Sequence, residues 1–301
     1  MTAEIPAHRG FTGQLVEFGE MIKITHTLFA MPFAVGAVFL AISLQEPLQS
    51  PGWIPFLQVI TAIAFARTSA MSFNRWADRH IDEKNPRTEN RSIPAGRLSA
   101  GQVLTATVLS VMGFLLTCFW IGEQALLLSP VVLLVVLGYS YMKRLTWLCH
   151  AVLGVGLGLA PVGAWLVITG DLGNLLPWIL GTAVLFWSAG FDIVYSCQDV
   201  DIDRAQGLNS IPARFGVPHA LIVSRIFHGI MILLLGWLCL EMNNSIPLLV
   251  ATIMTAALLC LGHFRIESEF RRLNRIENAL LEFNIAISFI FMIAMGTEIF
   301  L

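Results

Sequence analysis

The sequence has little charge and no cysteine arrangement typical of a structural site. Only 13% of the 301 residues are charged and 56% are hydrophobic, whereas soluble globular domains carry about 25% charged residues. This shortage excludes an ordinary soluble domain. The five cysteines are scattered along apolar segments without metal-ligand spacing, so we expect neither a zinc site nor a disulfide framework. Basic residues are also few, and because membrane topology accounts for them, the sequence gives no support for a nucleic-acid partner.

Long apolar segments dominate instead. A stretch of about 18 or more apolar residues is a candidate transmembrane helix, because about 20 residues cross the hydrocarbon core. We therefore predict an all-α integral membrane protein with a single domain over residues 1–301. Residues 1–20 are polar and the first apolar run is long enough to stay in the membrane, so we predict no separate signal peptide. The predicted bundle has nine transmembrane helices: 24–44, 53–73, 102–121, 125–142, 147–169, 175–197, 220–240, 246–263 and 282–300.

The distribution of basic residues orients this bundle. All but one of the 18 Lys and Arg residues fall in alternate connections, in the N-terminal arm, or near the adjoining helix ends. This is the positive-inside bias of membrane proteins, and it predicts a cytoplasmic N-terminus. A mixed-charge amphipathic run over 265–275 further predicts an interfacial helix that contacts anionic membrane lipids. The connections predicted to be cytoplasmic are 74–101, 143–146, 198–219 and 264–281.

Two acidic segments, 74–82 and 192–203, follow long apolar runs and are predicted to face the cytoplasm. Their polar side chains recur at intervals of four or seven, which places them on one helix face. Carboxylates gathered in one pocket resist joint ionisation unless cations compensate, and Mg²⁺ is usually held by carboxylates together with substrate phosphate oxygens. The stripes consist of Arg67, Asn74, Asp78 and Asp82 in the first segment, and of Asp192, Asp199 and Asp203 in the second, with Asp201 on the opposite side.

A short internal repeat accompanies the acidic segments. The first is followed by Ser92-Ile93-Pro94-Ala95 and the second by Ser210-Ile211-Pro212-Ala213. Each copy therefore runs from an apolar helix through an acidic helix end and a polar loop to the next apolar helix. Two copies of one unit predict a pseudo-symmetric bundle with one site where the copies meet.

Arg67 lies inside the second predicted span. A charge at that depth costs several kcal/mol unless it is paired or reaches water, so it is a functional candidate by default. The alternative is a structural salt bridge to Asp192 or another acid.

Other polar and small residues in the spans carry weaker signals. No His pairs with Cys or another His at ligand spacing. Lys23 and His26 lie near the cytoplasmic end of the first predicted span. The run Gly154-x-Gly156-x-Gly158 sits inside an apolar span with no strand before it. It predicts close helix packing rather than a dinucleotide-binding loop.

The spacing of the polar residues resembles that of the UbiA superfamily of membrane prenyltransferases. The matching motifs are Asn74-x-x-x-Asp78-x-x-x-Asp82 and Asp192-x-x-Tyr195-x-x-x-Asp199-x-x-x-Asp203. The opening run Met21–Ala30 is most similar to a bacterial branch described as 4-hydroxybenzoate polyprenyltransferase-like. The resemblance covers essentially the whole chain and extends to Arg67, to Asn85-Pro86-Arg87-Thr88 with Arg91, to Tyr139-x-x-x-Lys143-Arg144 and to Asn284.

The resemblance implies an enzyme of a bacterial inner membrane whose active site faces the cytoplasm. Such an enzyme transfers a polyprenyl group from an allylic diphosphate to a ring carbon of an aromatic carboxylic acid, with two Mg²⁺ ions on the diphosphate. It also implies that the loops 80–99 and 204–218 cap the site and exclude water. The implied metal ligands are Asn74, Asp78, Asp82, Asp199 and Asp203, and the implied diphosphate-binding residues are Arg67, Arg87, Arg91, Lys143 and Arg144. The implied catalytic residues are Asp78, Asp192 and Asp199, with Asp192 taking the ring proton or orienting the ring, and Lys23, His26, Tyr139 and Tyr195 are the candidates for acceptor binding.

The chain departs from the family pattern at two positions. Many members have Lys where this sequence has Asn209, and Pro where it has Ser140. The missing lysine removes one diphosphate contact that the resemblance implies for the second loop.

Two other classes of protein also use membrane carboxylates. A CDP-alcohol phosphotransferase begins its motif with Asp-Gly-x-x-Ala-Arg, which is absent here, and has fewer spans. A cation-coupled transporter would place ionisable residues near the bilayer midplane, whereas here they gather at one surface. Among prenyltransferase acceptors, 4-hydroxybenzoate and a naphthoate-type precursor of menaquinone both remain open.

Overall fold

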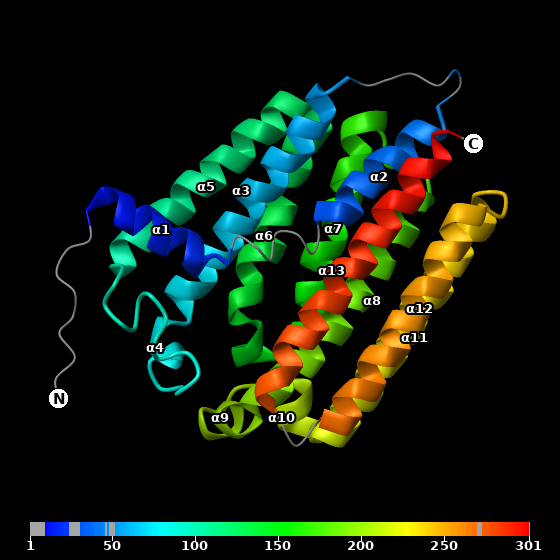
Figure 1. The fold of residues 1–301 in the computed structure, drawn as a ribbon. Coiled ribbons are helices and arrows are strands. Elements are labelled where there is room, and N and C mark those ends of the chain that lie inside the picture. Colours follow the sequence, from blue (N-terminus) through cyan, green and yellow to red (C-terminus); the bar gives the residue numbers. More distant parts are fainter. Residues whose placement is uncertain (1–9, 24–30, 46, 48–51, 270–272, 301) are drawn as a thin grey trace.

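A computed structural model describes residues 10–23, 31–45, 47, 52–269 and 273–300, and all regular secondary structure in this part of the chain is helical (Figure 1). Seven of its helices are long and apolar enough to cross a membrane, which makes the chain a multi-pass membrane protein. They are α3 (Ile54–Ala77), α5 (Ala100–Ile121), α6 (Glu123–Leu145), α7 (Cys149–Thr169), α8 (Leu176–Ser196), α11 (Val217–Glu241) and α12 (Ile246–Glu269).

The seven helices correspond to seven of the nine predicted spans. The other two predicted spans, 24–44 and 282–300, overlap α2 (Met31–Ser43) and α13 (Leu273–Glu298). Residues 24–30 lie outside the described chain, so the count of nine remains a prediction. The run 265–275, predicted to be an interfacial helix, does not form a helix of its own in the described residues: residues 265–269 end α12, residues 273–275 begin α13, and residues 270–272 lie outside the described chain. Its contact with lipid stays a prediction. An amphipathic run has the same period whether it lies flat on a membrane or extends a spanning helix, so the sequence did not separate the two.

Helix α8 occupies the centre of the bundle, where it packs against α7, α11, α2 and α13. Glycines allow its close approach to α7. A Cβ on Gly158 would lie 2.4 Å from the carbonyl oxygen of Gly181, and one on Gly154 would lie 2.6 Å from that of Leu185. The close packing predicted from the glycine run is therefore confirmed.

Aromatic side chains fill the core around α8. Trp187 is fully buried and contacts the Phe33 ring at a centroid distance of 4.9 Å, and Phe33 contacts Phe291 at 5.3 Å. The indole N–H of Trp187 donates to Oδ1 of Asn284 at 2.8 Å, because a buried indole needs an acceptor. This bond accounts for one polar residue inside α13.

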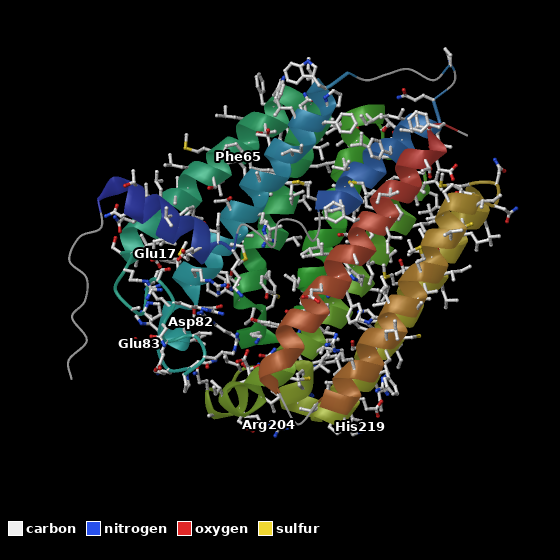
Figure 2. The ribbon with its side chains drawn as sticks, viewed as in Figure 1. Glu17, Phe65, Asp82, Glu83, Arg204 and His219 are labelled. Carbon is white, nitrogen blue, oxygen red and sulfur yellow. The ribbon has the colours of Figure 1, made fainter. Side chains whose placement is uncertain are left out.

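The short helices gather at one end of the bundle (Figure 1). The chain passes from α3 through α4 (Arg79–Asp82) and a loop to α5, and from α8 through the 3-10 turn η2 (Cys197–Asp199), α9 (Val200–Ala205) and α10 (Ile211–Phe215) to α11. Figure 2 shows Asp82 of the first connection and Arg204 of the second at this same end. The sequence repeat thus corresponds to a repeated order of elements.

The sequence predicted that each acidic segment continues the helix before it. In the structure, both helices break before the acidic segment ends. Helix α3 ends at Ala77, although Asp78 N still donates to Asn74 O at 2.9 Å and Asp82 N to Asp78 O at 2.8 Å. The spacing of four therefore survives in the first segment. In the second, the 3-10 turn at Cys197–Asp199 separates Asp192 from the other acids. Asp201 is exposed, in agreement with its predicted place on the opposite side.

The N-terminal helix α1 (Phe11–Met21) is tied to the loop between α4 and α5. The buried carboxylate of Glu17 accepts hydrogen bonds from Ser92 Oγ at 2.6 Å and from Arg97 Nε at 2.8 Å. Helix α5 then begins at a capping box, in which Ser99 and Gln102 exchange side-chain and backbone hydrogen bonds. The contacts of Glu17 thus fix the first loop against α1.

Candidate active site

Asp78, at the end of α3, is held between an amide and a guanidinium. Asn74 Nδ2 donates to Asp78 Oδ2 at 2.8 Å, and Arg144 Nη2 donates to Oδ1 at 2.8 Å and to the Ala77 carbonyl oxygen at 2.7 Å. Burial raises the pKa of Asp78 above its usual range, and the bond from Arg144 offsets part of that rise. Arg144 therefore links the end of α6 to the first acidic segment.

Asp82 is buried and has one oxygen in an ion pair. Arg91 Nη1 lies 2.7 Å from Asp82 Oδ1, while Oδ2 is buried with no hydrogen-bond partner among the described residues. A buried carboxylate oxygen without a donor is costly. Asp82 therefore keeps one buried carboxylate oxygen that no described donor satisfies.

Asp199 accepts hydrogen bonds from two side chains of the first loop. Arg87 donates from Nε to Oδ1 at 2.8 Å and from Nη2 to Oδ2 at 2.6 Å, and Asn85 Nδ2 donates to Oδ1 at 3.2 Å. Arg87 Nη1 also donates to the hydroxyl of Tyr195 at 3.0 Å. Burial lowers the pKa of Arg87, but the bond to Asp199 more than offsets this, so the net shift is upward.

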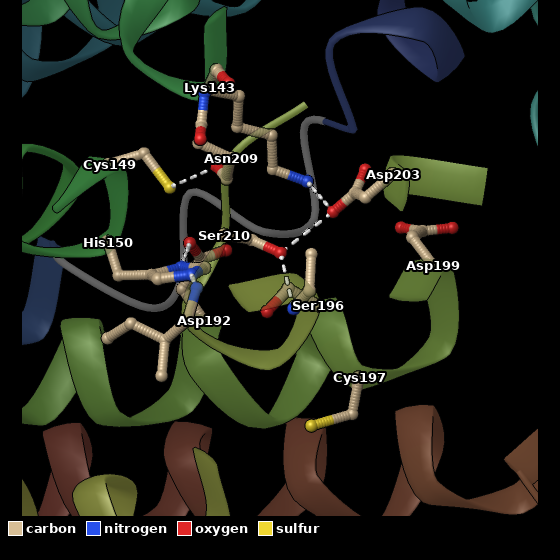
Figure 3. Close-up of polar contacts among 12 residues, drawn as sticks. Lys143, Cys149, His150, Asp192, Ser196, Cys197, Asp199, Asp203, Asn209 and Ser210 are labelled. Atoms are coloured by element: carbon tan, nitrogen blue, oxygen red, sulfur yellow. Dashed lines mark hydrogen bonds and ion pairs between the residues drawn. The ribbon is translucent and has the colours of Figure 1, made fainter. Parts of the chain in front are cut away.

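Asp203 contacts residues of α6 and of the second loop (Figure 3). Its Oδ2 lies 3.3 Å from Lys143 Nζ and accepts from Ser210 Oγ at 3.0 Å. Asn209, where the family resemblance predicts lysine, donates its backbone N–H to the carbonyl oxygen of Lys143 at 2.6 Å. The second loop therefore contacts α6 both through this backbone bond and through Asp203, which Ser210 and Lys143 share.

One pattern unites these contacts. Each of four acids predicted to bind metal forms an ion pair with a base predicted to bind diphosphate. One of the four pairs joins the two acidic segments, because Arg87 follows the first segment and pairs with Asp199 of the second. The pairs are Asp78–Arg144, Asp82–Arg91, Asp199–Arg87 and Asp203–Lys143.

Arg67 differs from the other four bases. Its Nη2 is 3.5 Å from the carbonyl oxygen of Lys23, and its Nε is buried without a hydrogen-bond partner in the described chain. The alternative of a salt bridge from Arg67 to Asp192 is wrong, because Asp192 pairs with His150 instead. Arg67 is thus half-buried, with a buried Nε that no described acceptor satisfies.

The predicted acceptor-binding residues lie on several elements. Tyr195 contacts Arg87, and Tyr139 is half-buried on α6, one turn before Lys143. Lys23 lies two residues after the end of α1, whereas His26 lies outside the described residues. Of these four residues, Tyr195 is thus linked to an acid of the site, through Arg87 to Asp199.

The structure adds polar residues to which sequence reasoning assigned no role. Arg75 is buried and donates to Asn74 Oδ1 at 3.3 Å. Asn85 bonds Asp199, and Ser210 bonds Asp203. His150, on the first turn of α7, lies 2.7 Å from Asp192 Oδ2 (Figure 3). Asn85 and Ser210 belong to recognised loop motifs, but a single His at a helix start carries no signal of its partner.

The ligand atoms that these residues offer suit a hard divalent cation. They offer carboxylate and amide oxygens, which Mg²⁺ prefers, and Asp82 Oδ2 is a buried oxygen without a donor. Yet no group of three or more His, Cys, Asp or Glu in the described chain is close enough together to hold a metal ion. A metal here needs further oxygens, and those of a phosphorylated substrate are the usual source.

A separate cavity of about 420 Å³ lies between α11 and α12. Its lining includes Arg225, His228, His263 and Glu267, but no acid of the two segments. His228 Nδ1 and His263 Nε2 are 2.8 Å apart, a contact that their separation in the sequence did not predict. This cavity is distinct from the acidic site.

Comparison with known sequences places the chain in one family. The model of the UbiA prenyltransferase family matches residues 29–285. Over 185 residues the chain is 32% identical to a 4-hydroxybenzoate octaprenyltransferase of Tolumonas auensis, a match that covers 60% of this chain and 64% of that protein. The chain thus spans just under two thirds of the length of this relative.

Solved structures give the same result. A UbiA homolog from Aeropyrum pernix K1, in its apo form, has a TM-score of 0.79 and 30% sequence identity, with 92% of this chain and 98% of that chain covered. A UbiA homolog from Archaeoglobus fulgidus bound to GPP and Mg²⁺ shares the fold, with a TM-score of 0.73 and 21% sequence identity. The match covers 95% of this chain and 100% of that chain. Because the family model spans well over half of the sequence, the chain belongs to the UbiA prenyltransferase family.

Proposed function

We propose that this protein transfers a polyprenyl group from an allylic diphosphate to a ring carbon of an aromatic carboxylic acid, with Mg²⁺, in quinone biosynthesis. The observation that carries the proposal is the meeting of two acidic segments at one end of a membrane bundle, joined by Arg87 on Asp199. Relatives named 4-hydroxybenzoate octaprenyltransferase support the reaction class. The acceptor is 4-hydroxybenzoate or a naphthoate-type precursor of menaquinone.

The acids and the bases have complementary tasks in this reaction. Bound magnesium, two ions in our proposal, would neutralise charge on the leaving diphosphate; the Archaeoglobus fulgidus relative binds Mg²⁺ together with GPP. Since four of the bases form ion pairs with acids, binding of the diphosphate would exchange these contacts for contacts to phosphate oxygens and metal. The residues that would hold the ions are Asn74, Asp78, Asp82, Asp199 and Asp203, and those that would bind the diphosphate are Arg67, Arg87, Arg91, Lys143 and Arg144.

The reaction balances as a substitution on the ring. The carbon–oxygen bond of the allylic diphosphate breaks, the diphosphate leaves with the electron pair, and a ring carbon of the acceptor forms the new carbon–carbon bond. The ring then loses a proton, which Asp192 accepts in our proposal. Its side chain is 18% exposed, so it can reach a ligand. The loops 80–99 and 204–218 would exclude water, which otherwise captures the allylic cation.

The location follows from the charge asymmetry of the chain. Nearly all Lys and Arg residues belong to connections at the acidic end or lie beside them, and such loops face the cytoplasm. We therefore propose nine spans in a bacterial inner membrane, a cytoplasmic N-terminus, a cytoplasmic active site and contact with membrane lipids. This orientation is tested by comparing how accessible loop residues at the acidic end are to a reagent on the outside and on the inside of inverted membrane vesicles.

The direct test is an assay on the purified protein in lipid nanodiscs. Both aromatic acids are offered with a short and a long allylic diphosphate, with Mg²⁺ or with EDTA, and products are identified by mass spectrometry. We expect one acid to be prenylated only when divalent metal is present. Absence of product from every combination would overturn the proposal, and equal conversion in EDTA would remove the role of the metal.

A further inference from the structure

His150 connects Asp192 with the second loop. Its imidazole is fully buried, 0% exposed, at the first turn of α7. Nδ1 lies 2.7 Å from Oδ2 of Asp192 on α8, and Nε2 lies 3.3 Å from the backbone nitrogen of Ile211, the first residue of α10. One ring therefore contacts a candidate catalytic carboxylate on one side and the second loop on the other.

The chemistry of these contacts assigns the proton on the ring. A backbone N–H can only donate, so Nε2 must accept from Ile211. A neutral imidazole that accepts at Nε2 carries its hydrogen on Nδ1, and that hydrogen points at Asp192. The amide of Ile211 thus selects the tautomer that donates to the carboxylate.

Asp192 differs in this respect from the other acids of the site. Asp78, Asp82, Asp199 and Asp203 each contact an Arg or Lys side chain, whereas Asp192 receives a neutral donor. A neutral hydrogen bond fixes the carboxylate without cancelling its charge. With Oδ2 held, Oδ1 is the oxygen left to meet a substrate.

The Ile211 contact belongs to a loop that also binds Asp203. Ser210, the residue before, donates to Asp203 Oδ2 at 3.0 Å and accepts from Ala213 N at 3.2 Å, which caps α10. Two consecutive residues, Ser210 and Ile211, are therefore connected to both acids. Ser210 contacts Asp203 directly, and Ile211 is linked to Asp192 through His150. Any shift of this loop changes both contacts together.

We propose that His150 is a positioning residue for Asp192, and that it makes the orientation of this carboxylate depend on the placement of the loop at residues 209–213. The inference rests on the proposed role of Asp192 as the group that receives the ring proton. When the loop is seated, the Ile211 amide holds the imidazole and the imidazole holds Asp192. When the loop lifts, the tautomer is no longer selected and Asp192 loses its fixed donor.

Two conservative variants separate the two bonds of the ring. In His150→Asn the amide nitrogen falls near the position of Nδ1, so it can donate to Asp192 but does not reach Ile211. In His150→Gln the amide falls near Nε2, so its oxygen can accept from Ile211 while the donor to Asp192 is lost. We expect His150→Gln to lower kcat by about 100-fold, the effect of a misplaced catalytic group, with little change in KM for the diphosphate.

His150→Asn should recover most of the kcat lost in His150→Gln, yet it should melt at a lower temperature because the Ile211 N–H is left buried without an acceptor. Activity and stability are thus expected to move in opposite directions. Hydrogen–deuterium exchange should rise at residues 208–213 in His150→Asn and stay low in His150→Gln. His219→Gln is the matched control, because His219 is exposed and bonds only the carbonyl oxygen of Phe215 among described partners.

A double-mutant cycle completes the test. If His150 acts through Asp192, then His150→Gln should cause no further loss of kcat in an Asp192→Asn background. A loss of activity in both His150 variants that simply follows their melting temperatures would show a packing role and overturn the inference. Full activity of His150→Gln would do so as well. Failure of the wild-type protein to form any prenylated product would instead overturn the proposed function, which keeps the two outcomes separate.

Discussion

Arg87 and Asp199 are 112 residues apart in the sequence, and they form a two-pronged ion pair with nitrogen–oxygen distances of 2.8 and 2.6 Å. A guanidinium fork matches a carboxylate and a phosphate equally well. In our proposal Arg87 binds the diphosphate and Asp199 binds metal, so this pair must open before either task begins. Until then, the positive charge of Arg87 and the negative charge of Asp199 compensate each other.

The first prediction concerns that fork. Arg87→Lys keeps the charge but makes one hydrogen bond in place of two, so we expect KM for the allylic diphosphate to rise about tenfold. The Mg²⁺ concentration for half-maximal rate should not rise, because Asp199 is released more easily. Steady-state kinetics with varied diphosphate and varied Mg²⁺ measure both quantities. Arg225→Lys is the control, since that exposed arginine pairs with Glu267 outside the site; an unchanged KM in Arg87→Lys would contradict the exchange of partners.

The second prediction concerns the acids themselves. Asp78→Ala or Asp199→Ala should lower turnover by more than about a thousandfold, because charge on the leaving diphosphate is no longer offset by metal. Asp201→Ala should retain full activity, since Asp201 is exposed on the opposite side of α9. Rates are compared at saturating Mg²⁺, with size-exclusion profiles to show that each variant is folded. Activity retained in both Asp78→Ala and Asp199→Ala would refute the site assignment.

Much of the fold follows from hydropathy because the bilayer imposes one length on every spanning helix. The predicted span 147–169 and the observed α7, Cys149–Thr169, agree closely for this reason. The spacing of four in Asn74, Asp78 and Asp82 also survives, since consecutive hydrogen bonds carry it past the end of α3. Local rules of helix geometry were sufficient for these features.

The contacts between distant segments were beyond the reach of such rules. Helical spacing tells which face a residue occupies, but not which side chain from another helix meets it. The sequence offered a salt bridge from Arg67 to Asp192 or another acid only as an alternative, and it gave no sign of the pair that the structure forms between Asp192 and His150. A histidine isolated in the sequence has no periodic companion, so only tertiary packing reveals its role.

The third prediction tests the packing of the bundle. A Cβ on Gly158 would lie 2.4 Å from the backbone oxygen of Gly181, which cannot move without displacing α8. We expect Gly158→Ala to cost about 1–3 kcal/mol, the usual penalty of overpacking, and therefore to lower the melting temperature in detergent. Gly163→Ala is the matched control on the same helix, because nothing lies within 4 Å of its added Cβ. Equal melting temperatures for the two variants would contradict the close approach of α7 and α8.

The last prediction separates a base kept for substrate from one that also stabilises the fold. Arg67 has a buried Nε without a partner in the described chain, whereas Arg91 neutralises the buried Asp82 at 2.7 Å. A buried charge that lacks a counter-ion destabilises the folded state, and removal of one member of a buried pair leaves the other exposed to the same penalty. Arg67→Met should therefore leave the melting temperature unchanged or raise it, while Arg91→Met should lower it by several degrees. Both variants should raise KM for the diphosphate by about tenfold or more, since each removes a cation from the site. Thermal unfolding without substrate, followed by kinetics, makes the comparison; a large loss of stability in Arg67→Met would show that this arginine has a structural partner and is not held in reserve for the diphosphate.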